Sequence, residues 1–386
     1  MLCLPSAATL LAAVTLPRVS RHLPPQCSLA GFDENVDSQQ ALETLLHAAN
    51  LTAEPTNVEE MSAGFCNWVY RVDLPDHNPV VVKLFSPLAK LRLEPALRGC
   101  GDEEAGAESL GPRLLYRSPD GMVCDFIEGE TLTESDMHAP ASDLPALIAP
   151  RLAALHGEPL PLGGASSCRS GAVVAGALAA GRSPILWQFL NSMVDRIAEA
   201  TDRLPPGLTL AQIRSEVERM RRRCDALSLP LVRGHGDLKP SNVMAKSRDI
   251  CFIDFELAGC HYRGYDLFKL FRTAGPRSAE NMRTFLRSYL SCRKRKSEAE
   301  AVLELEELEA EANAAEPLTW LEAAVFFCFA TCVYPSQSAE WTPLALQRWE
   351  AYLQSAASVD EGGVATNALL AARQKRVNAA AGGGAA

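Results

Sequence analysis

The sequence predicts an α+β protein of two lobes, a small lobe built on an antiparallel sheet and a larger, mostly helical lobe. Two observations support this prediction. Short segments rich in β-branched and aromatic residues, separated by turn signals, occupy the chain up to about Gly129. Beyond Gly129, apolar residues recur three to four positions apart over long stretches, which is the spacing of amphipathic helices.

The individual elements follow from local signals. The turns Pro75-Asp-His-Asn78 and Ser118-Pro-Asp-Gly121 each separate two apolar runs, which predicts two pairs of strands. Between these pairs, Pro95, Gly99 and Gly101 interrupt a helix-like stretch. The predicted elements, in chain order, are a helix at 38–50, strands at 67–74 and 79–85, an interrupted helix at 88–110, strands at 113–117 and 122–127, and helices at 146–156, 184–203 and 210–227.

Composition limits the class of protein. The chain has 386 residues, of which 47% are apolar, so it can bury a sizeable core. Its net charge of −10 and pI near 5.3 argue against a nucleic-acid partner, because such a partner requires a positive surface. No uninterrupted apolar run reaches the roughly 18 residues of a membrane span, so none is predicted. Twelve cysteines without a Cys-x-x-Cys pair indicate reduced thiols rather than a zinc site or a disulfide framework.

One polar motif dominates the second half of the chain. Residues 233–242 read Arg-Gly-His-Gly-Asp-Leu-Lys-Pro-Ser-Asn, so that Asn242 follows Asp237 by five positions. In phosphotransferases such an Asp orients the attacking hydroxyl and the Asn binds a metal ion. Twelve residues later, Asp254 lies in an apolar run that predicts a strand, where such enzymes hold Mg²⁺ against the nucleotide phosphates. We therefore expect an enzyme that uses ATP and Mg²⁺, with His235 and Asp237 catalytic and Asn242 and Asp254 as metal ligands.

The first lobe offers residues for the nucleotide. The loop Ser62-Ala-Gly-Phe-Cys-Asn67 precedes a predicted strand, where backbone N–H groups can face phosphate oxygens, so Ser62 and Asn67 are candidate contacts. Lys83 ends the next strand and is expected to neutralise the α- and β-phosphates. Such a lysine needs a carboxylate partner on the following helix. Glu94 is the first choice for this partner, and Glu103 and Glu104 are the alternatives.

Residues 125–128, Asp-Phe-Ile-Glu, are expected to form a hinge whose backbone binds the adenine, which makes Asp125 and Ile127 candidate nucleotide contacts. The interval between Asp254 and Asp266 is only twelve residues, which leaves no room for the activation segment of a protein kinase.

The motifs together resemble the choline/ethanolamine kinase family, within the aminoglycoside phosphotransferase-like and protein-kinase-like folds. Residues 254–266 read Asp-Phe-Glu-Leu-Ala-Gly-Cys-His-Tyr-Arg-Gly-Tyr-Asp, similar to the family's Asp-Phe/Tyr-Glu-Tyr-Ala-Gly-x-Asn-Tyr-Arg-x-Phe-Asp. Residues 62–71, 125–132 and 345–352 are also similar to family segments, so the resemblance covers about 38–356. It implies a two-lobed protein-kinase-like fold, Asp237 as catalytic base, and Asp266 as a brace for the catalytic loop.

The substrate half departs from the family pattern. Choline kinases surround the quaternary ammonium with aromatic rings, and the resemblance puts Phe327 and Ala330 at the positions of two family tryptophans. Phe326 or Phe329 are alternative sources of a ring. Further family positions that line the pocket, a tyrosine, a glutamate, a second tyrosine and an asparagine, are here Leu344, Thr273, Ser278 and His261. These differences favour ethanolamine over choline, because a primary ammonium can be held by carboxylates.

The sequence thus predicts an ATP-dependent kinase of a small amino alcohol, with Glu256 and Phe327 beside Asp237 at the substrate. Glu256 can equally be a structural hydrogen-bond acceptor. Another metabolite or an aminoglycoside-like acceptor is the second interpretation, and a pseudokinase that serves as a binding module is the third. A pseudokinase requires a lost base or metal ligand, and none is lost here. A homodimer is left open.

Four parts are predicted: a leader at 1–37, a nucleotide-binding lobe at 38–130, a catalytic and substrate-binding lobe at 131–357, and a disordered tail at 358–386. The first 32 residues contain no Asp or Glu and carry an apolar run, Ala7 to Leu16, ahead of Arg18 and Arg21. This pattern is typical of a targeting leader, and a disordered segment is the alternative. We expect a cytoplasmic protein, or an organellar one if the leader is a targeting peptide.

Overall fold

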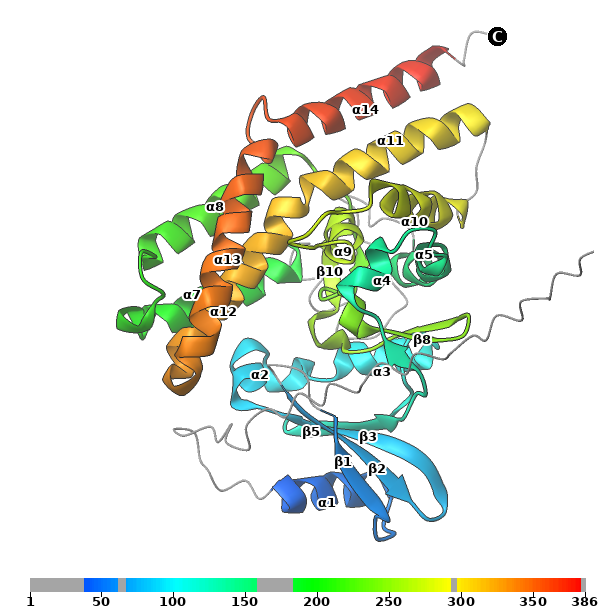
Figure 1. Ribbon diagram of the computed structural model, residues 1–386, viewed down its shortest axis with the longest axis vertical. Coiled ribbons are helices and arrows are strands. Elements are labelled where there is room, and N and C mark those ends of the chain that lie inside the picture. The colour runs from blue at the N-terminus through cyan, green and yellow to red at the C-terminus, as the bar shows by residue number, and fades with distance from the viewer. Residues whose placement is uncertain (1–37, 62–66, 158–182, 293–296, 383–386) are drawn as a thin grey trace, which may run out of the picture. The chain divides into compact units, whose positions relative to one another are not determined.

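The computed structural model describes residues 38–61, 67–157, 183–292 and 297–382, all within the unit Val36–Ala386. The predicted leader and Ser62 lie outside the described residues. Two lobes are present, as predicted: an antiparallel sheet with one covering helix, and a larger helical lobe (Figure 1). The elements of the first lobe are α1 (Ser38–Ala48), β1 (Asn57–Glu60), β2 (Asn67–Leu74), β3 (His77–Phe85), β4 (Leu114–Arg117) and β5 (Gly121–Asp125).

The sheet has the order β1-β2-β3-β5-β4, and all its neighbours are antiparallel. Val80 and Val82 in β3 point into the small core, where Leu42, Leu45 and Leu46 of α1 cover them. Lys83 follows Val82 and therefore projects to the opposite face of the sheet, because side chains alternate along a strand. This alternation directs the Lys83 ammonium toward the second lobe.

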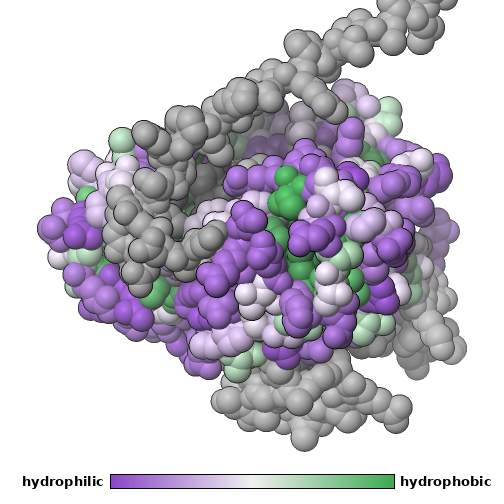
Figure 2. Space-filling view, turned by 90° about the horizontal axis from the view of Figure 1, so that it is seen from below, coloured by the Kyte–Doolittle hydropathy of each residue, from purple (hydrophilic) through white to green (hydrophobic). Residues whose placement is uncertain are grey.

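β1 was not predicted, and its composition explains why. Its four residues, Asn57 to Glu60, are all exposed and include two glutamates, so the strand has no apolar alternation. Charged side chains on an edge strand discourage pairing with other chains. Figure 2 views the molecule from the α1 side, and the part that is not grey is mostly hydrophilic with small apolar groups between.

The interrupted helix predicted at 88–110 consists of α2 (Pro87–Arg92), a 3-10 turn (Pro95–Leu97) and α3 (Cys100–Ala107). This segment joins the two lobes, since Leu93 packs against Phe189 and Leu257 of the second lobe. Gly101 permits a close approach: a Cβ at this position would collide with the Phe255 carbonyl oxygen. The approach of α3 to Phe255 brings the next residue, Asp102, to the metal-binding strand end.

The second lobe is mostly helical. One core cluster of this lobe joins α5, α9, α10 and α11 around aromatic side chains that include Phe252, Phe285 and Tyr289. The helices are α4 (Glu134–His138), α5 (Leu144–His156), α7 (Ile185–Ala198), α8 (Leu210–Ala226), α9 (Arg263–Lys269), α10 (Ala279–Ser291), α11 (Glu298–Ala314), α12 (Glu316–Val333) and α13 (Ser338–Ala356). The short strands are β6 (Glu130–Thr131), β7 (Leu231–Gly234), β8 (Val243–Lys246), β9 (Asp249–Phe252) and β10 (Gly259–Tyr262).

Among the described residues, one helical stretch, Glu298–Val333, has the length and apolarity of a membrane span. Its apolar window is 89% buried inside the protein, and α13 and α7 pack against α12. Burial of this kind is typical of a core helix.

The predicted disordered tail is wrong for most of its length. Residues Val364–Gly382 form α14, which lies along α11 (Figure 1). Leu369 is fully buried, and Lys375 pairs with Glu306 of α11 at 2.7 Å. The tail lacks a regular apolar stripe, so its sequence alone indicated no partner surface. Its helix is stabilised by contacts with α11.

Candidate active site

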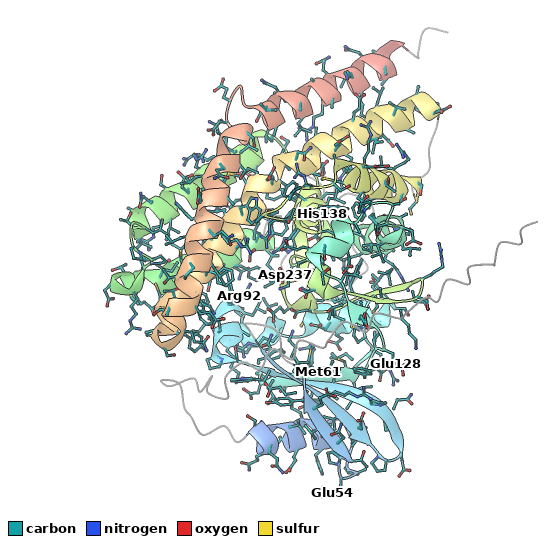
Figure 3. All side chains as sticks on the ribbon, in the orientation of Figure 1. Glu54, Met61, Arg92, Glu128, His138 and Asp237 are labelled. Atoms are coloured by element: carbon teal, nitrogen blue, oxygen red, sulfur yellow. The ribbon has the colours of Figure 1, made fainter. Side chains whose placement is uncertain are left out.

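Two short antiparallel pairs hold the polar motif. β7 ends directly before His235 and pairs with β10, and β8 begins directly after Asn242 and pairs with β9. The loop between β7 and β8 therefore carries Asp237, and the chain leaving β9 reaches Asp254. Strand pairing brings these residues together at the junction of the two lobes, where Figure 3 labels Asp237.

Asp266 braces the loop, as the resemblance implies. Its carboxylate accepts hydrogen bonds from the backbone N–H groups of His235 at 2.6 Å and Gly236 at 3.0 Å, and contacts His156 Nε2 at 3.2 Å. Burial acts to raise its pKa, but the hydrogen bond and charge of His156 and the nearby His261 lower the pKa to about 2. Gly236 has φ of +81°, and a Cβ there would collide with the Leu257 carbonyl, so only glycine suits this turn.

His235, a predicted catalytic residue, is held by two contacts with the backbone. It is fully buried, its Nε2 donates to the Ile253 carbonyl at 3.0 Å, and its Nδ1 accepts the N–H of Asp237 at 3.3 Å. Burial lowers the pKa of His235, which favours the neutral ring that these two contacts require. His235 therefore positions Asp237, and any direct catalytic role of His235 stays a prediction.

Asp237 is held by cations on both oxygens. Lys269 Nζ lies 2.8 Å from Oδ1, and Lys239 Nζ lies 2.9 Å from Oδ2. Asn242 Nδ2 donates to the Asp237 carbonyl at 2.8 Å and to Oδ2 at 3.2 Å. Burial opposes ionisation, but the two ammonium groups hold the pKa of Asp237 well below its usual range. Asp237 is therefore a carboxylate that can accept a hydrogen bond from an acceptor hydroxyl.

Asp254 and Asn242 offer the oxygen donors that Mg²⁺ requires. Asp254 adopts a left-handed backbone (φ +67°), an uncommon conformation for a residue other than glycine that clusters at functional sites. Its Oδ1 forms an ion pair with Lys83. The amide N–H₂ of Asn242 faces Asp237, which leaves its Oδ1 for another partner. A carboxylate and an amide oxygen suit Mg²⁺ bound jointly with phosphates, so the donor set fits the predicted metal. Lys83 neutralises Asp254 when no metal is bound.

The predicted partner of Lys83 is wrong. Glu94 is exposed at the start of the 3-10 turn, Glu103 pairs with Arg117 at 2.7 Å, and Glu104 lies 3.6 Å from Arg233. The carboxylate of α3 that lies close to Lys83 is the buried Asp102. Pro95 and Gly99 break the helix between Glu94 and Asp102, which turns Glu94 out to solvent.

Asp102 is strained electrostatically. Its Oδ1 accepts the Phe255 N–H at 3.3 Å, but its Oδ2 has no hydrogen-bond partner among the described residues. Burial raises the pKa of Asp102 to about 6, against the opposing effect of Lys83. Ionisation of Asp102 in the folded protein is therefore unfavourable.

We expect Asp102→Asn to stabilise the protein at pH 8. In the unfolded chain Asp102 ionises near pH 4, and in the folded protein near pH 6, so the wild type loses stability as pH rises between these values. A shift of this size corresponds to at most about 3 kcal/mol. Thermal unfolding at pH 4 to 8 should show a mutant advantage that grows with pH. An advantage that is constant with pH would contradict this assignment.

Glu256 acts as a structural acceptor between the lobes, which was the alternative interpretation of this residue. One oxygen accepts Asn67 Nδ2 at 2.9 Å and lies 3.6 Å from Lys83, and the other lies 3.4 Å from Arg92. Its side chain is 8% exposed. Asn67, a predicted nucleotide contact, is thus tied to Glu256, and neither group is directed at an acceptor by these contacts.

Phe327, the predicted aromatic contact, lies in α12 beside Phe326. It is buried, with its ring centre 5.2 Å from that of Phe326, and its contact with a substrate stays a prediction. Phe329 is fully buried in the core. The face of Phe326 is covered by the Arg92 guanidinium, 4.9 Å from the ring centre. A cation of the protein itself therefore lies over the ring of Phe326, one of the two alternative rings.

The hinge residues lie where predicted, at the end of β5. Asp125 pairs with β3 through Val80, and its carboxylate forms an ion pair with Arg113 at 2.9 Å. Ile127 is half-buried in the segment between β5 and β6. Their contact with adenine stays a prediction.

Sequence reasoning missed Lys239, Lys269 and Glu322. Lys239 was visible within the motif, but a lysine after His-x-Asp-x is easily taken for a solvated residue. Lys269 and Glu322 lie 53 residues apart and meet at 3.0 Å, 1% and 8% exposed. A lysine in the apolar turn 267–271 and a glutamate inside an apolar helix were the available signals, since buried charges are generally paired.

The fold and the site together indicate the class of protein. A lysine on the sheet of the first lobe pairs with an aspartate that follows a strand of the second lobe. Both lie next to a loop with the spacing Asp-x₄-Asn, and this arrangement is that of the protein-kinase-like fold. Within that class, the chain belongs to the choline/ethanolamine kinase family, since the family model with this description matches residues 58–352.

Individual relatives are distant. The human choline/ethanolamine kinase is 23% identical over 234 residues, 55% of this chain and 53% of the relative. A probable ethanolamine kinase of Arabidopsis thaliana is 24% identical over 223 residues, 55% and 54% of the two chains. This chain spans about half the length of the curated relatives it matches. A Plasmodium vivax ethanolamine kinase structure has a TM-score of 0.60 at 18% identity, covering 81% of this chain and 86% of that one, and it supports the fold.

Proposed function

We propose that this protein transfers the γ-phosphate of ATP to the hydroxyl group of a small amino alcohol. The observation that supports this most is the arrangement around Asp237: an ionised, braced carboxylate in the same loop as Asn242, with Asp254 and Lys83 adjacent. All groups for base and metal chemistry are present, which favours an enzyme over a pseudokinase.

In the proposed reaction, separate residues of the chain bind the nucleotide, orient the hydroxyl and hold Asp237 in place. Asp254 and Asn242 would hold Mg²⁺, which would supply charge neutralisation at the nucleotide phosphates, and Lys83 would then be released from Asp254 to bind those phosphates. Lys239, 40% exposed, is free to leave Asp237 Oδ2. The vacated oxygen then accepts the acceptor hydroxyl and orients it for attack. The buried Lys269 keeps the other oxygen in place.

Ethanolamine is the better candidate of the two alcohols named for the family. Relatives named as ethanolamine kinases include those of Arabidopsis thaliana and Drosophila melanogaster. Ala330 and Leu344 supply no ring, and Arg92 covers Phe326. A quaternary ammonium relies on ring faces, whereas a primary ammonium can donate hydrogen bonds.

We expect choline to be a poorer substrate than ethanolamine by about ten- to several-hundred-fold in kcat/KM. The loss of two or three rings, at about 0.5–2 kcal/mol each, gives this range. Competition kinetics with both alcohols, scored as ADP formation and as labelled phosphate ester, measures it. Equal or better use of choline would show that rings outside the described contacts rebuild the cage. ATP consumption that no alcohol stimulates would reject the proposed function.

A further inference from the structure

The acceptor side of the catalytic loop already contains a cation. Lys269 is 1% exposed, and its Nζ contacts Asp237 at 2.8 Å, Glu322 at 3.0 Å and the Tyr265 hydroxyl at 2.9 Å. One protein ammonium thus satisfies both carboxylates. Burial acts to raise the pKa of Glu322, but Lys269 and the nearby Arg272 and Arg92 hold it below its usual range.

The other carboxylates around Asp237 are also paired with cations of the protein. Asp254 pairs with Lys83, and Glu256 pairs with Lys83 and Arg92. In the parts of the chain that the structure describes, each of these carboxylates therefore has a protein cation as its partner. A simple cationic alcohol would have to compete with them.

Close to Lys269 and Glu322 in the same two segments, the guanidinium groups of two arginines contact one tryptophan ring. Arg272 follows Lys269 by three residues, and Trp320 precedes Glu322 by two. The Arg272 guanidinium lies 5.1 Å from the centre of the Trp320 ring and donates to the Thr319 carbonyl. The Arg348 guanidinium, from α13, lies 5.3 Å from the same centre. The charge of Arg272 acts on Glu322, so this pair lies near the Lys269–Glu322 contact that reaches Asp237.

Neither Arg272 nor Arg348 has a carboxylate within 4.0 Å among the described residues, although Trp320 itself is buried. Burial and the charge of Arg272 lower the pKa of Arg348, and Glu134 opposes this only in part. Arg277 provides a contrast, because it lies 4.7 Å from the Phe268 ring centre and also pairs with Glu316 at 3.7 Å. Two neighbouring guanidinium groups without an acidic partner favour a bound oxyanion.

We infer that Arg272 and Arg348 bind an anionic group of the acceptor, so that the preferred acceptor is a small alcohol, such as an amino alcohol, that also carries a carboxylate or a phosphate. This inference rests on the proposed function and refines its acceptor. A zwitterion supplies its own counter-charge to its ammonium, which removes the need for a free protein carboxylate. In the reaction, the acceptor oxygen bonds to the γ-phosphorus, the bond from that phosphorus to the ADP oxygen breaks, and the hydroxyl proton passes by way of Asp237 to solvent.

Matched acceptors test the inference. L-Serine is ethanolamine with one added carboxylate, and glycerol 3-phosphate is glycerol with one added phosphate. With the full chain, ATP and Mg²⁺, kcat/KM for at least one anionic member should exceed that of its partner by about tenfold or more, the value of one charge-assisted contact. The serine arm reports a carboxylate and the glycerol arm a phosphate. Anionic members that are equal to or worse than their partners in both arms would overturn the inference.

Variants connect the preference to the two arginines. Arg272→Gln and Arg348→Gln should lower kcat/KM for the anionic member by about tenfold more than for its partner, since each variant loses a contact that only the anionic member makes. Arg277→Gln, which removes a paired arginine from the same region, should retain the preference. Equal losses for both members in either arginine variant would refute the role, and thermal unfolding verifies that each variant is folded.

Binding separates this inference from the proposed function. Calorimetric titration of L-serine and glycerol 3-phosphate into the protein with ADP and Mg²⁺ needs no turnover. Affinity that depends on Arg272 and Arg348 without any phosphate transfer would reject the proposed function and support the anion site. Transfer to ethanolamine, with neither preference for nor binding of the anionic members, would support the function and reject the anion site.

Discussion

Asp237→Asn is expected to lower kcat by about two to four orders of magnitude, with ATP affinity within a few-fold of wild type. The amide cannot accept a proton, and it loses the charge that Lys239 and Lys269 neutralise. ATP is expected to be held by Lys83, Asn242 and Asp254, which keep their places. Steady-state kinetics with the best acceptor and fluorescence titration of a nucleotide analogue measure the two effects.

A matched control guards against a general effect of removing a charge. Asp195→Asn changes an exposed carboxylate of α7 whose only ion pair, with Arg214, is 3.8 Å long among the described residues. It should retain wild-type kcat. Wild-type turnover in Asp237→Asn would eliminate this residue as the group that orients the hydroxyl.

Asp254→Ala is expected to abolish both metal-dependent nucleotide binding and catalysis. Of the two proposed Mg²⁺ ligands Asn242 alone would then remain, and Lys83 loses the carboxylate with which it forms an ion pair. A metal that bridges β- and γ-phosphates contributes several kcal/mol of charge stabilisation, so we expect a loss of at least about three orders of magnitude in kcat/KM.

Titration of MgATP and of ATP in EDTA distinguishes the metal effect from misfolding. The wild type should bind ATP more tightly with Mg²⁺, and Asp254→Ala should show no such difference. Asp120→Asn, a change at an exposed carboxylate paired with Lys90, serves as the control. Full activity of the wild type in EDTA would contradict the kinase mechanism as a whole.

The positions of site residues that lie close together in the sequence were predictable. Asp237, Asn242 and Asp254 share one loop and one hairpin, so their spacing alone places them together. Lys83 was predictable because an alternating strand directs it to one face. The partner of Lys83 was not, because the choice among Glu94, Asp102, Glu103 and Glu104 depends on where the chain bends at Pro95 and Gly99.

Contacts between distant segments were the main source of error. α14 is stabilised because Leu369 is buried and its basic residues pair with α11. No pattern in the low-complexity tail indicates that surface. Glu256 was expected at the substrate, but the approach of Arg92 from α2 ties it to the lobe junction. Both outcomes depend on which side chains become buried, and local sequence patterns do not show this.

The sequence by itself determined the two-lobed α+β fold, the loop that carries Asp237 and the candidate metal ligands, because regular periodicity and short fixed intervals encode them. Only the tertiary structure decided the charges around the proposed acceptor site. Lys269 meets Glu322, and Arg272 and Arg348 meet on Trp320, through the packing of α9, α12 and α13. A buried charge is tolerated only beside its partner, and partners far apart in the chain become neighbours only when the helices pack.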